Sequence, residues 1–106
     1  MESNKKYSLT ITKIQQGPAL TLHLDGRLDA ITCKDLNTVL ETCLNGVNHL
    51  TFELEKLSYI SSAGLRSLLL AQKSMGKQGK MVVRGANEIV LETFHSIGFD
   101  RIMTIE

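Results

Sequence analysis

The chain has 106 residues, of which 42% are hydrophobic and 22% charged, close to globular averages, which argues against a disordered or fibrous chain. Its length suits one compact domain spanning residues 1–106. The 12 basic and 11 acidic residues leave a net charge of +1, without the basic excess that nucleic acid binding rewards. No apolar stretch approaches the roughly 20 residues of a membrane span, and residues 1–6 lack the apolar core of a signal peptide. The sequence therefore predicts a cytoplasmic protein with no nucleic acid or membrane partner and with a flexible segment at residues 1–6.

Cysteine and histidine usage gives no sign of a cross-link or a cofactor. Cys33 and Cys43 fall on one predicted helix, where ten residues correspond to about 15 Å of rise, too far for a disulfide. The histidines stand singly, without ligands at a metal-binding spacing; they are His23, His49 and His95. We therefore expect no metal site, no disulfide and no cofactor.

The predicted elements begin with a β-hairpin. Residues 8–14 and 19–24 alternate apolar and polar side chains, and Gly17-Pro18 between them is a turn signal. A helix is expected from about Thr32 to Leu44, with Thr32 and Asp35 forming a capping box.

The second half of the chain continues the alternation of strands and helices. The expected elements are a strand at 49–54, a helix from the Ser61-Ser62 pair to Gly76 or Gly79, a strand at 80–84, a helix from Asn87 to a Gly98-Phe99 cap, and a last strand at 102–105. The order β-β-α-β-α-β-α-β predicts an α/β fold with a mixed sheet whose later strands run parallel. Alternation in the strands leaves one face polar, so helices should lie mainly on the other face.

The serine pair at positions 61 and 62 is the most informative local feature. A nucleophile elbow needs G-x-S-x-G, but Ile60 stands two residues before Ser62, and no histidine is placed by sequence as its base. A serine at a helix start is favoured as an N-cap. The helix dipole and its free N–H groups would also stabilise a phosphate on such a serine.

Four segments together resemble a known family. They are Leu57 to Leu65 (LSYISSAGL), Gly26-Arg27-Leu28-Asp29, Lys80 to Arg84 and Ile97-Gly98-Phe99. In this arrangement the chain resembles the STAS domain of bacterial anti-sigma factor antagonists. The likeness extends from about Tyr7 to Ile105 and agrees with the order of elements derived above.

The resemblance implies a partner-switching protein without enzymatic activity. Family members bind an anti-sigma factor serine kinase while unphosphorylated, are released when that kinase phosphorylates them, and are restored by a metal-dependent serine phosphatase. The family pattern D-S-x-G-L places the phosphoacceptor at Ser62, and this chain departs from it at Ser61, where many members carry Asp. The expected partner-binding residues are Asp29, Ser61, Ser62, Ala63, Gly64 and Arg66.

Some interpretations stay open at this point. Asp29 matches the family's acidic position, and we expect it to serve recognition with almost no effect on stability. Leu70 falls off the buried stripe of its helix and is a candidate contact residue. Two other functions are an unmodified STAS scaffold subunit of a larger signalling or transport assembly and a small-ligand-binding module. A phosphate-binding G-x-x-x-x-G-K-[ST] loop is absent, which argues against nucleotide hydrolysis.

Overall fold

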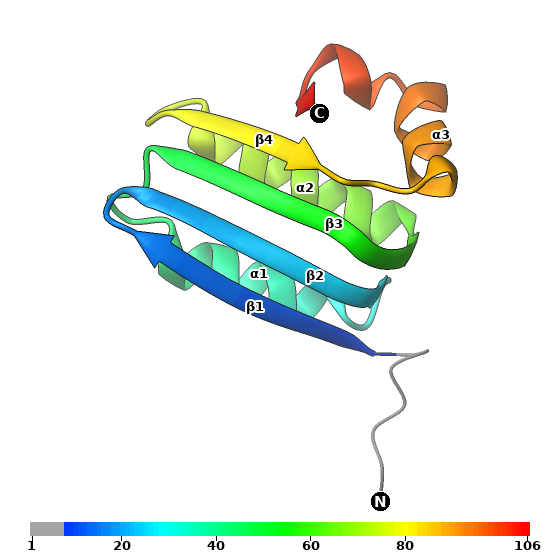
Figure 1. Ribbon diagram of the computed structural model, residues 1–106, viewed down its shortest axis with the longest axis horizontal. Helices are drawn as coiled ribbons and strands as arrows, with labels where there is room; N and C mark the ends of the chain where they lie inside the picture. The colour runs from blue at the N-terminus through cyan, green and yellow to red at the C-terminus, as the bar shows by residue number, and fades with distance from the viewer. Residues whose placement is uncertain (1–7) are drawn as a thin grey trace, which may run out of the picture.

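The computed structural model describes residues 8–106, and the flexible segment expected at residues 1–6 lies outside them. Five strands form one sheet in the order of the sequence. They are β1 (Leu9–Gln16), β2 (Ala19–Leu28), β3 (His49–Ile60), β4 (Lys80–Arg84) and β5 (Thr104–Ile105). The first two strands are antiparallel and every later pair is parallel, which confirms the expected mixed sheet (Figure 1).

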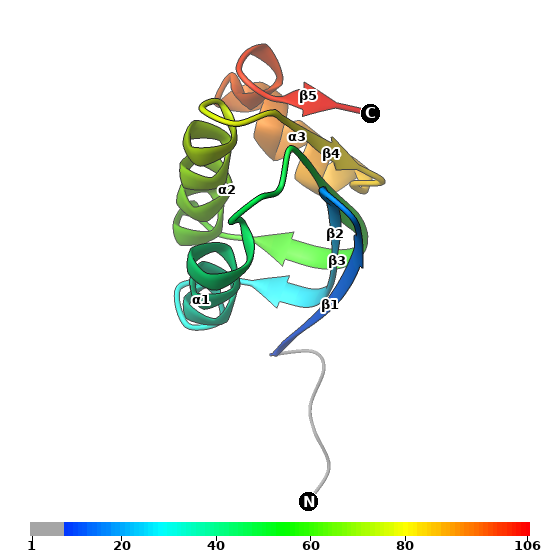
Figure 2. The same cartoon turned by 90° about the vertical axis from the view of Figure 1, so that its left-hand side faces the viewer.

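Three α-helices connect the parallel strands: α1 (Cys33–Cys43), α2 (Ser62–Met75) and α3 (Glu88–Ser96). Figures 1 and 2 show α1 and α2 on one face of the sheet, while α3 lies beyond the carboxyl end of β4. The helices therefore lie mainly on one face, as expected. No helix in residues 8–106 is long and apolar enough to cross a membrane.

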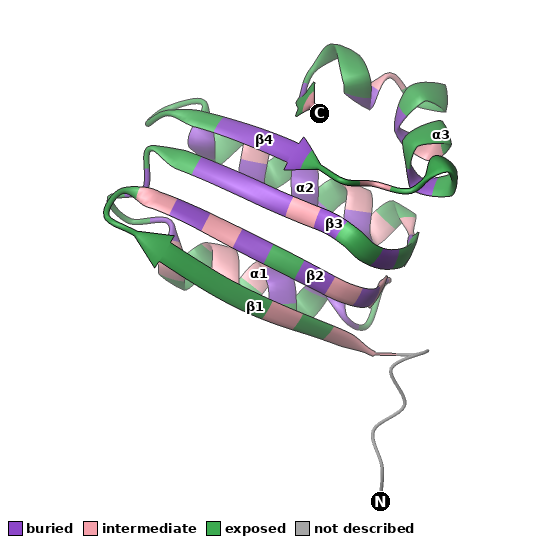
Figure 3. Ribbon diagram, in the orientation of Figure 1, coloured by how far each residue is buried: buried purple, intermediate pink, exposed green. Residues whose placement is uncertain are grey.

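Alternation of buried and more exposed residues in β2 and β3 divides the sheet into a buried and an open face. The side chains directed at the helices are almost fully buried, and they are Leu20, Leu22, Leu24, Leu50, Phe52 and Leu54. Figure 3 shows the alternation of buried and more exposed residues along β2. Burying each such side chain contributes about 1.5–3 kcal/mol, so this layer is the main source of stability.

Strand β3 is longer than the sequence predicted. The alternation ends at Leu54, but the strand continues to Ile60 because two shifts in its register with β2 each leave an extra residue in β3. Buried residues then recur every third position, at Leu54, Leu57 and Ile60. A period of two therefore could not reveal this half of the strand.

The expected capping box at the start of α1 is wrong. The Thr32 hydroxyl donates to the Arg27 carbonyl at 2.7 Å and accepts from the Asp29 backbone N–H at 2.9 Å, so it does not bond the Asp35 N–H. The hydrogen bond to the Arg27 carbonyl directs the Thr32 hydroxyl away from the helix. The cap expected at Asn87 is confirmed, since its side-chain oxygen accepts from the Val90 N–H at 2.9 Å.

In the carboxyl-terminal segment the expected helix cap is confirmed, but the last strand is shorter than expected. Gly98 has a φ of 81°, which favours glycine, and Phe99 after it stacks on Phe94 with ring centroids 6.0 Å apart. Phe99–Arg101 form a 3₁₀ helix, and the Met103 N–H donates to the Phe99 carbonyl at 2.9 Å. This turn delays β5 until Thr104.

Gly64 allows α2 to pack closely against the end of β2. A Cβ atom at this position would lie 2.7 Å from the Leu28 Cγ and 2.9 Å from the Leu28 carbonyl oxygen. Both distances are shorter than real contacts allow, and one involves backbone that cannot move away cheaply. A residue without a side chain is therefore required for this contact.

We expect Gly64→Ala to lower the free energy of unfolding by about 1–3 kcal/mol, because the added methyl group overpacks the contact with Leu28. Gly76→Ala is the matched control, since its nearest neighbour would be 3.4 Å from the new Cβ. Its effect should stay within about 0.5 kcal/mol. Urea unfolding of both variants measures the difference, and equal stabilities would contradict a close helix–strand contact.

Candidate functional site

The candidate site lies where β2 and β3 end side by side. Leu28 pairs with Ile60 as the last pair of this parallel ladder, and the Ser61 N–H donates to the Leu28 carbonyl at 2.9 Å. The turn at residues 29–32 and the Ser61-Ser62 pair follow these strand ends directly. The structure thus brings together the two segments that the sequence singled out.

Ser61 is the N-cap of α2. Its backbone is extended, with φ −98° and ψ 176°, and its hydroxyl accepts from the Gly64 N–H at 3.3 Å. Its carbonyl accepts from the Leu65 N–H at 2.9 Å. Asp and Ser are both favoured N-cap residues, so the departure from the Asp of the family pattern preserves the cap.

Ser62 is the first residue of α2 and is exposed. Its hydroxyl has no hydrogen-bond partner within residues 8–106, in contrast to that of Ser61. The helix dipole places partial positive charge at this end, where N–H groups lack partners within the helix. The arrangement presents a free hydroxyl at a position that favours negative charge.

Asp29 organises the turn after β2. One of its carboxylate oxygens accepts from the Ile31 N–H at 3.0 Å, the Thr32 N–H at 2.9 Å and the Thr32 hydroxyl at 3.2 Å. The bond from the Thr32 backbone is the main cause that lowers the pKa of Asp29 below 3.8, with further help from Ile31, the Thr32 hydroxyl and Arg27. These bonds argue against the expectation that Asp29 contributes almost nothing to stability.

Sequence reasoning missed three residues around this turn. The Arg27 guanidinium lies 4.1 Å from the centre of the Tyr59 ring, and the Arg27 Nε is 3.8 Å from an Asp29 carboxylate oxygen. Tyr59 is 39% exposed and Ile31 is 77% exposed, so two apolar side chains face solvent beside the serine pair. Tyr59 and Arg27 both lie in segments of the family resemblance, but only the strand register, which pairs Arg27 with Tyr59, shows that they meet.

The remaining expected site residues differ in accessibility. Ala63 is half-buried and packs against the core, Gly64 is buried against Leu28, and Arg66 is exposed one turn after Ser62. Contacts of these three residues with a partner stay predictions. Leu70, another candidate contact residue, is 51% exposed.

The histidines do not form a catalytic group with Ser62. His49 begins β3 at the opposite end of that strand, and His23 lies in the middle of β2 on the open face of the sheet. His95 in α3 bonds Asp100 at 2.9 Å, a contact that raises the pKa of His95. In the part of the chain that the structure describes, no three His, Cys, Asp or Glu side chains gather as metal ligands.

Comparison with known proteins decides the family. Residues 10–106 match the family model of the STAS domain. The chain belongs to the STAS domain family. The matched segment covers nearly all of the chain and includes every residue of the candidate site.

Solved structures with the same fold include anti-sigma factor antagonists. An antagonist from Mycobacterium paratuberculosis has a TM-score of 0.86 and 17% identity, covering 99% of this chain and 89% of that one. Unphosphorylated SpoIIAA has a TM-score of 0.68 and 15% identity, with 89% and 96% covered. The phosphorylated form of the Bacillus cell fate determinant SpoIIAA has a TM-score of 0.71 and 16% identity, with 92% and 90% covered. This STAS domain therefore has a SpoIIAA-like fold.

We expect Asp29→Ala to lower the free energy of unfolding at pH 7 by about 1 kcal/mol, because the turn loses an acceptor of three hydrogen bonds. A folded-state pKa below 3.8 means that this contribution is present above about pH 4 and is lost as the pH falls through the folded-state value. The difference between wild type and variant, measured by urea unfolding, should therefore shrink on acidification.

Asp35→Ala is the matched control. Asp35 is exposed in the first turn of α1 and interacts mainly with the helix dipole, so its loss should cost about 0.5 kcal/mol or less. If Asp29→Ala is as stable as wild type at pH 7, the carboxylate does not hold the turn.

Proposed function

We propose that this STAS domain is a non-enzymatic anti-sigma factor antagonist that binds an anti-sigma factor serine kinase and is released when Ser62 is phosphorylated. The observation that supports this function is the exposed, unbonded Ser62 hydroxyl at the start of α2, beside a Ser61 hydroxyl that is engaged in the cap. The two serines are neighbours of the same type, but only Ser62 combines exposure with a free hydroxyl. While the antagonist holds the anti-sigma factor, the sigma factor is free, and phosphorylation of Ser62 ends that state, so the domain regulates sigma-factor-dependent transcription.

The unphosphorylated protein presents a mixed apolar and polar surface to the kinase. Ile31 and Tyr59 supply exposed apolar area, and such side chains act as anchors in protein interfaces. Arg66 supplies a charge that can pair with a carboxylate of the partner. The hydrogen-bonded turn at Asp29 holds the segment that carries Ile31, so the surface is ordered before binding.

Phosphorylation changes the charge of this surface while leaving the fold intact. The kinase transfers the γ-phosphoryl group of ATP to the Ser62 oxygen, ADP leaves, and the hydroxyl proton passes to a base of the kinase. The new group carries nearly two negative charges. Arg66 lies four residues further along α2, where side chains are neighbours, so the phosphate competes with a partner carboxylate for this arginine.

The same chemistry explains why the cycle is reversible. The helix dipole stabilises the phosphate at the first residue of α2, so the phosphorylated domain stays folded. A metal-dependent serine phosphatase supplies water and metal to cleave the phosphorus–oxygen bond, which returns the free hydroxyl. The domain itself supplies the acceptor and the docking surface.

We expect one phosphate per chain, on Ser62, when the protein is incubated with its anti-sigma factor kinase, ATP and Mg²⁺. Ser62→Ala should bind the kinase without being released, and Ser62→Asp should bind a hundredfold more weakly or worse. That loss corresponds to about 2.7 kcal/mol, typical of an uncompensated interface charge. Mass spectrometry of the phosphopeptide and calorimetry measure the two effects.

Ser61→Ala is the control for the neighbouring hydroxyl. It should lose about 1 kcal/mol of stability with the cap but still accept phosphate on Ser62. Phosphate on Ser61 would contradict the assignment of the acceptor. Tight kinase binding without any phosphate transfer by an active kinase would favour an unmodified STAS scaffold subunit.

A further inference from the structure

Strand β1 forms one edge of the sheet, and within residues 8–106 no strand lies on its outer side (Figure 1). It pairs with β2 over all eight of its residues without a bulge. The residues from Thr12 to Gln16 are all exposed, and Lys13 is the one charged residue of the strand, which contains no proline. Long edge strands with few charges, no proline and no bulge are open to pairing with another chain.

The opposite edge of the sheet is protected against such pairing. Strand β5 has only two residues, and an edge strand that short offers few backbone groups to another chain. Arg84 and Glu106 add charges beside it, with the Arg84 Nε 3.9 Å from a Glu106 carboxylate oxygen. Of the two edges, β1 is therefore the one that is built as a pairing surface.

Half of the backbone groups of β1 point away from β2. The Arg27 N–H donates to the Ser8 carbonyl at 2.9 Å, and hydrogen-bonded pairs in an antiparallel ladder alternate with non-bonded pairs. The even-numbered residues of β1 therefore bond β2, and the odd-numbered residues direct their N–H and C=O groups outward. No other element of residues 8–106 bonds these outward groups, which belong to Leu9, Ile11, Lys13 and Gln15.

We propose that β1 pairs with β1 of a second copy of this chain, antiparallel and about a two-fold axis at Thr12, so that the two sheets become one. In this register Ile11 of one copy faces Lys13 of the other, and Leu9 faces Gln15. Outward-directed residues thus meet outward-directed residues, and each such pair exchanges two hydrogen bonds. Every outward backbone group of β1 obtains a partner in this way.

Charge and strand length select this register. A register centred on Lys13 would set the two lysines directly opposite each other, and like charges in that position are destabilising. A register centred on Ile11 would leave Gln15 without a partner residue in β1. Centring on Thr12 avoids both costs and brings two threonine hydroxyls together, a pair that stabilises neighbouring strands. A two-fold arrangement presents the same groups from both sides, which makes a second copy the matching occupant.

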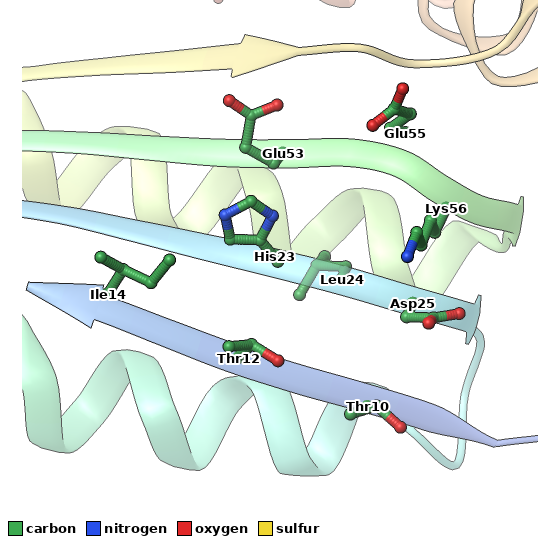
Figure 4. A pocket seen from close by; sticks show the side chains of 9 residues that line it. All are labelled: Thr10, Thr12, Ile14, His23, Leu24, Asp25, Glu53, Glu55 and Lys56. Carbon is green, nitrogen blue, oxygen red and sulfur yellow. The ribbon is translucent and has the colours of Figure 1, made fainter.

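The pairing also covers apolar surface on the open face. Figure 4 shows Thr10, Thr12 and Ile14 along β1, where they border a hollow of about 280 Å³ on this face. Ile14 is 46% exposed. In the joined sheet Ile14 faces Thr10 of the other copy and loses part of its contact with water, which adds a hydrophobic contribution to the hydrogen bonds.

The joined sheet keeps the two candidate sites apart. Leu9 pairs with Gly26, so β1 begins close to the end of β2 that carries the site. Because the two β1 strands run in opposite directions, the two Ser62 residues lie towards opposite ends of the dimer. The pairing therefore does not depend on phosphorylation of Ser62.

Disulfide cross-linking of the full chain tests the register. Thr12 faces its own copy in a non-bonded pair, where Cα atoms lie about 4.5 Å apart, within the range of a disulfide. Thr12→Cys should therefore form a covalent dimer with oxidised glutathione, which is reduced to glutathione as the two thiols join. Both test variants carry Cys43→Ser, because Cys33 is buried and Cys43 is the partly exposed native thiol.

Thr10→Cys is the matched control, since Thr10 is an exposed threonine on the same face of the same strand. In the proposed register it lies four residues away from its own copy, about 13 Å along the strand, too far for a disulfide. We expect at least tenfold more covalent dimer from Thr12→Cys than from Thr10→Cys. Equal yields would show random collision and overturn the proposal.

Sedimentation velocity of the full chain measures the pairing without a cross-link. One strand edge buries less area than a standard interface of about 1,600 Å², so we expect a dimer with a Kd between about 1 μM and 1 mM. Lys13→Pro should weaken this dimer at least tenfold, because the Lys13 N–H points outward and serves only the bonds between copies. Lys13→Gln keeps the N–H, removes the charge and should dimerise at least as tightly as wild type.

Two results of the sedimentation experiment would overturn the proposal. One is a wild-type chain that remains monomeric at about 1 mM, and the other is a dimer that a folded Lys13→Pro variant leaves unchanged. Circular dichroism reports whether the proline variant is folded. If it unfolds, the comparison of Thr12→Cys with Thr10→Cys decides the matter, since neither change removes a backbone N–H.

Discussion

The close contact between the end of β2 and the start of α2 positions the whole candidate site. The Leu28 carbonyl accepts from the Ser61 N–H at 2.9 Å, and the same residue fills the space where a Cβ of residue 64 would lie. Because the hydrogen bond joins two backbone groups and Gly64 packs directly on Leu28, α2 cannot slide along the strand without losing this bond or creating a clash. The serine pair and the Asp29 turn are therefore held side by side.

This contact separates the residues that hold the site from those that remain free. The side-chain oxygens of Ser61 and Asp29 accept hydrogen bonds from backbone N–H groups at a helix start and in a tight turn. The side chains of Ser62 and Arg66 do not hold the backbone in this way, and both residues are exposed. This division suits the proposed switch, in which a phosphate with nearly two negative charges would alter the interface while the fold stays constant.

The two bulges in β3 shape both faces of the molecule. The extra residues shift β3 relative to β2, so that Asp25 stands in register with Lys56, and Arg27 with Tyr59 at the site. Extra residues of this kind redirect side chains at strand ends. The aromatic contact beside the serines thus depends on these two bulges.

Local patterns in the sequence determined the order of elements, the parallel half of the sheet, and the helix starts at the Ser61-Ser62 pair and at Asn87. Those features depend on residues within one turn or one strand, where periodicity and capping act. Only the tertiary structure decided that β3 continues to Ile60, that Thr32 bonds Arg27 rather than Asp35, and that Arg27 lies over Tyr59. These contacts join separate segments or depend on how β2 and β3 are aligned. No local pattern encodes that alignment, because a bulge changes the register of two strands while the apolar and polar residues of each strand stay the same.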